Sequence, residues 1–269
     1  SPAKNGYMKE LIGVRFLASG SGTLMIVTFC AMFFAGVSLA FAVRENLVEP
    51  VLYSLGALQV LGLIFAIRLP SIGAYDETLK FPWKQFLTFK YARRKMAKAW
   101  KNRALRQSIV GQAIFWVMIF LMVFVIQDQF SSGSLFTQDA LANYAIFGTG
   151  IGLVAGFWFA MRMSRNFIEM GLIPMGTAGA SILIFIIPLI PRPYNAIAFA
   201  LLGFCGGIFA LPMFATMLYN TKPRSAGHVL SLSNVVQNLS ILVFDILAIV
   251  AIRYFAVDRM SLFFILGIV

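Results

Sequence analysis

The chain contains repeated apolar runs, each long enough to cross a membrane. A hydrocarbon core about 30 Å thick requires roughly 20 mostly apolar residues in a helix. Windows of this length predict seven spans, at residues 21–43, 50–67, 108–126, 143–161, 170–190, 196–219 and 229–252. An eighth apolar run, 260–269, is too short to cross with the residues present. We therefore expect an all-α polytopic membrane protein with seven to eight transmembrane helices.

The composition argues against several other classes of protein. Of the 269 residues, 60% are hydrophobic and 12% are charged, against roughly 45–50% and 25% in soluble domains. Two cysteines are too few for a disulfide scaffold. The apolar runs are continuous rather than alternating, which argues against a transmembrane barrel. The sequence shows no nucleophile–base pair, phosphate loop or cluster of metal ligands, so we expect no enzyme activity, no cofactor and no metal site.

The basic residues indicate how the spans are oriented. If residues 69–107 are cytoplasmic, 18 of the 22 Lys and Arg residues fall on the cytoplasmic side of the spans. Cytoplasmic loops of membrane proteins carry such an excess. The net charge of +12 is then a topology signal. We expect a multi-pass protein of the cytoplasmic (inner) membrane, with membrane lipids and not nucleic acid as its surroundings.

A basic polar segment, residues 69–107, divides the chain. It carries ten basic residues against Asp76 and Glu77. If residues 82–107 are helical, Trp83, Phe86 and Trp100 lie near one face, which predicts a helix in the headgroup layer. We therefore expect a basic cytoplasmic linker with some interfacial helix, and a specific lipid or partner site is the alternative. We expect two helices of an N-terminal bundle in 1–68 and a six-helix C-terminal bundle, its last helix truncated, in 108–269.

Several motifs after this segment resemble those of one transporter family. They are residues 108–116 (SIVGQAIFW), 148–156 (GTGIGLVAG), 168–176 (IEMGLIPMG), 206–212 (GGIFALP), 224–231 (RSAGHVLS) and 234–238 (NVVQN). In order and spacing they are similar to motifs of the lysophospholipid transporter branch of the major facilitator superfamily. The resemblance implies that the chain covers about helices five to twelve of a partial major-facilitator fold.

The same resemblance implies a function in lipid transport. Family members move lysophospholipid across the cytoplasmic membrane, and two bundles rocking about a central site would give alternating access. Some members are fused to acyltransferase and acyl-carrier-protein synthetase domains, so the implied partners are an acyltransferase domain or other membrane subunits. The chain begins at Ser1 and ends inside an apolar run, which suggests a piece of a longer protein. Eight helices do not make two six-helix halves, so a non-transporting structural or scaffold subunit is the alternative function.

Asp245 is the most distinctive polar residue within a predicted span. A carboxylate there costs at least ~2.5–3.5 kcal/mol on insertion scales, so such groups usually face a cavity or a partner. At helical spacing Asn234, Asn238 and Asp245 share one stripe, with Gln237 beside it. This stripe is predicted to bind the substrate headgroup or a coupled cation. The alternative is an interhelical polar contact, worth about 0.6 kcal/mol.

The first two turns of the span at 108–126 carry a second group of candidate residues. Gln112, Phe115 and Trp116 could line the substrate path, with the aromatic rings against an acyl chain. The alternative is an aromatic belt at the membrane interface.

A third group of candidates lies at a helix junction. Arg162, Arg165 and Glu169 could form a gate whose charge pairs break when the bundles rock. The alternative is ordinary anchoring by basic residues at the cytoplasmic side. Close packing of helices is expected at Gly148, Gly150, Gly152 and Gly156, because small residues let a neighbouring backbone approach.

Overall fold

The computed structural model is all-helical in the part of the chain that it describes. That part comprises residues 13, 16–44, 47–68, 96–97, 99–130, 138–165, 167–191, 194–222 and 225–255. The helices are α2 (Leu17–Arg44), α3 (Val48–Ile67), α6 (Arg103–Phe130), α7 (Gln138–Met163), α8 (Leu172–Ile186), η1 (Ile187–Leu189), α9 (Asn195–Tyr219) and α10 (Ala226–Phe255). The predicted eighth run, 260–269, and residues 69–95 of the basic segment lie outside the described residues.

Six of these helices are long and apolar enough to cross a membrane, which confirms an all-α multi-pass membrane protein. The predicted span at 170–190 is divided into α8, with 15 residues, and the short 3₁₀ helix η1. Pro188 explains the change, because proline has no backbone N–H to continue the α-helical hydrogen bonds. Large side chains such as Ile151 and Ile197 point outward, 68% and 64% exposed. Apolar outer faces of this kind suit contact with lipid.

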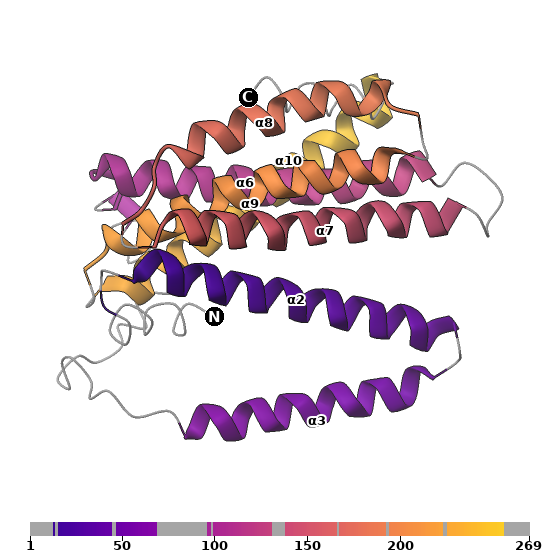
Figure 1. The fold of residues 1–269 in the computed structure, drawn as a ribbon, viewed down its shortest axis with the longest axis horizontal. Helices are drawn as coiled ribbons and strands as arrows, with labels where there is room; N and C mark the ends of the chain where they lie inside the picture. Colours follow the sequence, from indigo (N-terminus) through magenta and orange to yellow (C-terminus); the bar gives the residue numbers. More distant parts are fainter. Residues whose placement is uncertain are drawn as a thin grey trace.

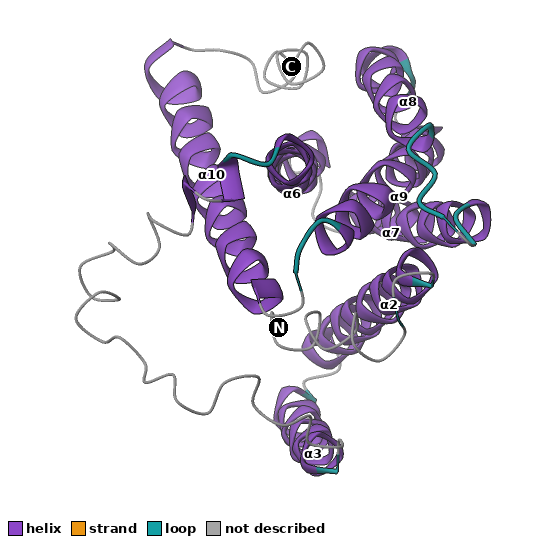
Figure 2. Ribbon diagram, turned by 90° about the vertical axis from the view of Figure 1, so that its left-hand side faces the viewer, coloured by secondary structure: helices purple, strands orange, loops and turns teal. Residues whose placement is uncertain are grey.

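Helix α9 lies at the centre of the described helices, as Figures 1 and 2 show. It packs against α2, α6, α7 and α8. Helix α10 packs mainly against α6, on the side of α6 away from α9. Helices α6 and α8 both rest on α9 but have no extensive contact with each other in the described part of the chain.

Glycines bring α7 and α9 to backbone contact. A Cβ atom added to Gly152 or Gly156 would overlap the carbonyl oxygens of Ala200 or Phe204 on α9. In return, a Cβ on Gly207 of α9 would lie 2.6 Å from the carbonyl oxygen of Leu153. The close packing expected at these α7 glycines is therefore confirmed, and its partner is α9. A seam without side chains holds two backbones at a fixed spacing, so these helices form a rigid base for their neighbours.

Helix α2 packs on the same base from the other side. A Cβ on Gly150 of α7 would overlap the ring of Phe33, so this glycine forms the socket for an α2 side chain. Further along α2, the ring of Phe29 lies 5.2 Å from that of Phe157 on α7. Among the described helices, α3 contacts only α2 extensively, and it stands apart from the others in Figures 1 and 2. Of the two helices assigned to the N-terminal bundle, α2 thus packs on the C-terminal helices and α3 does not.

One end of the described helices is basic. Helices α6 and α10 begin there, whereas α3, α7 and α9 end there. The described basic residues at this end are Arg68, Lys101, Arg103, Arg106, Arg162, Arg165 and Lys222. Glu169 is the acidic residue at the same end among those described. We call this the basic end; that it faces the cytoplasm stays a prediction from the sequence.

Candidate functional site

A cavity of about 710 Å³ lies between α6, α8 and α9, and we call it the α6–α8 cavity. Thr149 and Leu153 of α7 contribute to its wall. It exists because α6 and α8 lean on the two sides of α9 without closing on each other. Cavities that hold small ligands have volumes of about 300–1,000 Å³. The α6–α8 cavity is therefore large enough for a ligand.

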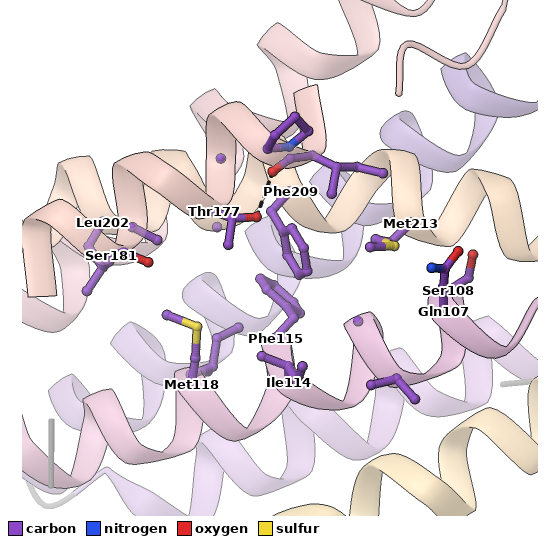
Figure 3. Close-up of a pocket in the computed structure, with 18 of the residues that line it drawn as sticks. Gln107, Ser108, Ile114, Phe115, Met118, Thr177, Ser181, Leu202, Phe209 and Met213 are labelled. Atoms are coloured by element: carbon purple, nitrogen blue, oxygen red, sulfur yellow. Dashed lines mark hydrogen bonds between the residues drawn. The ribbon is translucent and has the colours of Figure 1, made fainter. Parts of the chain in front are cut away.

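Each wall of the cavity follows helical periodicity, so one face of each helix is turned inward. The main lining residues are Gln107, Gly111, Phe115, Met118 and Met122 from α6, Ile173, Thr177, Ala180 and Ile184 from α8, and Leu202, Gly206, Phe209 and Met213 from α9. Figure 3 shows many of these side chains converging from the three helices. The lining is almost entirely apolar, and methionine side chains adapt well to irregular apolar ligands.

The hydroxyl groups in the lining do not make it strongly polar. Three of them donate to backbone carbonyl oxygens of their own helices: Ser108 Oγ to Ala104 at 2.9 Å, Thr149 Oγ1 to Ala145 at 2.9 Å and Thr177 Oγ1 to Ile173 at 2.7 Å. Thr216 Oγ1 donates to the Met170 sulfur at 3.3 Å. The bond of Thr177 is drawn in Figure 3. A hydroxyl that donates its proton to a carbonyl oxygen of its own helix does not need a water molecule as a hydrogen-bond acceptor. It can therefore contact an apolar ligand.

Charge is concentrated at one end of the cavity. Arg106, Gln107 and Ser108 line it where α6 begins, at the basic end. The Arg106 side chain is exposed, and no hydrogen bond or ion pair reaches it from the described residues. From Ser108 to Met122 the cavity follows 14 residues of α6, which is about 21 Å at 1.5 Å per residue. The cavity is thus long and apolar, and at one end it has an arginine that no described residue pairs with.

Of the candidates expected on α6, the structure places Phe115 in the cavity wall and not the other two. Gln112 is buried, and its Nε2 donates to the carbonyl oxygen of Ala210 at 2.9 Å, which joins α6 to α9. Trp116 faces α2, where its ring stacks on Phe29 with centroids 6.2 Å apart. Both residues therefore have packing contacts in the described structure.

The stripe expected on α10 is also outside the cavity lining. Asn234 and Asn238 are exposed, and Asn238 Nδ2 donates to the Asn234 carbonyl oxygen at 2.8 Å. Gln237 is half-buried and its Nε2 donates to Ser233 Oγ at 2.9 Å. Along α10, Asn234 and Asn238 are thus exposed, whereas Gln237 beside them is half-buried.

Asp245 is half-buried on the face of α10 that meets α6. On this face Ala248 and Ile241 pack with Val117 and Leu121 of α6, and Asp245 lies between them by helical spacing. No hydrogen bond or ion pair reaches its carboxylate from the described residues. A carboxylate without a described partner in an apolar contact lowers the stability of the protein. Because Asp245 lies outside the cavity lining, its predicted binding of a headgroup or cation stays a prediction.

The three predicted gate residues share the α7–α8 junction without forming an ion pair among the described residues. Arg162 lies over the ring of Trp158, with 5.5 Å between the guanidinium carbon and the ring centroid. Arg165 is exposed. The Glu169 carboxylate accepts a hydrogen bond from the Gly171 backbone N–H at 3.3 Å, at the start of α8. In this conformation Glu169 stabilises its own turn.

Arg106, Phe209 and Met213 line the α6–α8 cavity but were not predicted from the sequence. On α6 the spacing could have indicated the cavity wall, because Gln107, Gly111 and Met118 share a face with the predicted residue Phe115 at intervals of three or four residues. Nothing comparable marked α9, whose apolar residues surround the whole helix. Comparisons of the chain with protein-family models, with curated proteins and with solved structures found no match, so the candidate site is defined by its geometry alone.

Proposed function

We propose that this membrane protein binds a lysophospholipid in the α6–α8 cavity and moves it across the membrane. The observation that carries the proposal is the shape of the cavity: one long apolar space with a cation at one end. A lysophospholipid matches both parts, because it has one apolar acyl chain and one headgroup with a negatively charged phosphate. The resemblance of the sequence to lysophospholipid transporters supports the same substrate independently.

The charge at the basic end suits a phosphate group. Arginine binds phosphate through two parallel N–H···O bonds, and Arg106 has its donors free of partners in the described structure. Gln107 and Ser108 line the cavity beside it and can contact the glycerol or headgroup oxygens. The headgroup is therefore placed at the start of α6, near the membrane boundary.

The length of the cavity suits one acyl chain. Half of a hydrocarbon core of ~30 Å is about 15 Å, the depth that one leaflet provides for a chain. The cavity extends about 21 Å from Ser108 to Met122, which leaves room for a chain and its glycerol linkage. Because α6 and α8 do not close on each other, a chain can enter from the side without leaving the bilayer.

A photolabelling experiment tests the binding step. The full chain in lipid nanodiscs is exposed to a lysophospholipid that carries a diazirine in its acyl chain, and the labelled peptides are identified. Labelling is expected on the cavity faces of α6 and α8, near Ile114 and Ile173, and excess unlabelled lysophospholipid should suppress it. Label that is absent, or confined to outer faces such as that of Ile197, contradicts the proposal.

Two arginines of α6 provide a matched pair of variants. Arg106→Gln removes the charge at the cavity and should weaken labelling about tenfold, since charge-assisted hydrogen bonds contribute ~1.5–3 kcal/mol. Arg103→Gln removes the same charge one turn earlier, at an exposed residue outside the lining, and should leave labelling unchanged. Transport is then measured in proteoliposomes as the rate at which lysophospholipid added outside becomes protected from extraction by albumin.

Helix α3 favours a second candidate function, that of a structural subunit in a membrane complex. No residue of the apolar stretch Glu49–Ile67 is fully buried, and a Cβ on Gly56 or Gly62 would meet nothing within 4 Å. Such a helix offers its whole surface to a partner helix. If this function holds, Gly62→Leu should reduce the mass of the purified complex on native gels, while variants of the cavity should not.

A further inference from the structure

Two phenylalanines narrow the middle of the α6–α8 cavity. Phe115 of α6 and Phe209 of α9 point toward one another across it in Figure 3. Towards the basic end the lining includes Arg106, Gln107 and Met213, and towards the far end it includes Met118, Ser181 and Leu202. The rings therefore separate a mouth that carries Arg106 and Gln107 from an inner part that carries no charged residue of the lining.

The Phe115 ring and the backbone of Phe209 are both held by packing. Phe115 is 4% exposed, and its ring meets the edge of Trp116 at a centroid distance of 5.8 Å. Phe209 is half-buried, and its backbone lies against α8: a Cβ on Gly176 would be 3.0 Å from the Phe209 Cβ and 2.8 Å from its backbone nitrogen. Well-packed interiors do not deform continuously. The width between the rings is thus set by the packing of three helices.

We propose that Phe115 and Phe209 determine how many acyl chains the cavity accepts. The inference rests on the proposed function and adds the residues responsible for its selectivity. One chain passes between the rings and fills the inner part, while its headgroup stays with Arg106. The second chain of a two-chain phospholipid has no passage between the rings beside the first, because the backbones of α8 and α9 meet at Phe209, and it would be left in the lateral opening between α6 and α8. Two-chain lipids of the surrounding bilayer are therefore excluded, although they are far more abundant there.

Phe209 is the better residue for a test, since it is less buried than Phe115. The full chain in nanodiscs is labelled with the diazirine lysophospholipid and challenged with unlabelled one-chain or two-chain lipid with the same headgroup. In the unmodified protein the one-chain lipid should compete better by about tenfold or more, the scale on which apolar pockets discriminate by size. Phe209→Ala should widen the passage and bring the two competitors to within about threefold.

Two further variants control for effects on folding. Phe120→Ala removes an equally large ring from α6 at a residue that is 48% exposed and outside the lining, so the preference should persist. Phe209→Leu retains most of the packing and should give an intermediate preference, which keeps the test valid if Phe209→Ala does not fold.

The outcomes separate this inference from the proposed function. If excess unlabelled lysophospholipid does not suppress labelling of the unmodified protein, the proposed function is wrong. If one-chain and two-chain lipids suppress the labelling equally, the cavity does not select by the number of acyl chains, although it is still a binding site. A preference that persists in both Phe209 variants shows that the rings are ordinary packing and overturns the role assigned to them.

Discussion

The glycine seam between α7 and α9 should not tolerate even one added methyl group, and Gly207→Ala tests this. A Cβ on Gly207 would lie 2.6 Å from the Leu153 carbonyl oxygen and 2.8 Å from the Phe157 nitrogen. Ordinary contact begins near 3.4 Å, so the backbones must separate by about 0.8 Å at this point. Both obstructing atoms belong to the helix backbone, and no side chain can rotate away to relieve the overlap.

The expected cost is that of overpacking, about 1–3 kcal/mol. This corresponds to a roughly 5- to 150-fold change in the unfolding equilibrium constant. Gly62→Ala on α3 is the matched control, because a Cβ there would meet nothing within 4 Å. In an open helical site alanine is favoured over glycine by about 0.5–1 kcal/mol, so this variant should be neutral or slightly stabilised.

Both free energies can be measured by reversible unfolding in mixed micelles of dodecyl maltoside and SDS, followed by far-UV circular dichroism. We expect changes in stability of opposite sign for the two variants, or a clear loss of stability for Gly207→Ala alone. If Gly207→Ala unfolds at the same SDS fraction as Gly62→Ala, the two backbones are not in contact and the rigid base inferred for the cavity is wrong.

Three further substitutions have defined outcomes. Gln112→Leu removes the hydrogen bond to Ala210 and should cost about 0.5–1.5 kcal/mol in the same unfolding measurement; no loss would mean that this bond does not join α6 to α9. Gly150→Leu fills the socket of Phe33, so disulfide cross-linking between cysteines placed at residues 23 and 161, which are in contact in the unmodified chain, should fall sharply. Asp245→Leu should raise the free energy of unfolding by about 1–3 kcal/mol, because it removes a carboxylate with no described partner from an apolar contact; if stability falls instead, Asp245 has a stabilising partner.

Residues on single helices show how far the sequence could predict the site. Asp245 stood out because a carboxylate in an apolar span is a local property, but its neighbours on α6 are known only from the packing. Asn234 and Asn238 share a stripe with Asp245 at ideal helical spacing, yet the structure exposes both while Asp245 is half-buried. Helical spacing predicts which residues share a face; it does not show which face meets another helix.

Phe115 and Trp116 make the same point for α6. They are adjacent in sequence, and both were expected along a substrate path or in an interfacial belt. Consecutive helical residues point about 100° apart, so the structure turns Phe115 toward the cavity and Trp116 toward Phe29 of α2. The sequence could not predict which of the two faces a cavity and which faces another helix, because this depends on where α2, α8 and α9 lie around α6.

By itself the sequence determined that this is a multi-pass membrane protein, and it determined six of the seven predicted spans and the basic end. These follow from local composition, since a hydrocarbon core requires about 20 apolar residues and retains basic residues at one side. Only the tertiary structure decided that α6 and α8 stand apart on α9, with an apolar cavity between them and Arg106 at its end. The reason is that lipid solvates any apolar face as well as another helix does, so hydrophobicity cannot assign faces inside a membrane. The assignment comes from shape, above all from glycines that bring α7 and α9 together and leave α6 and α8 apart.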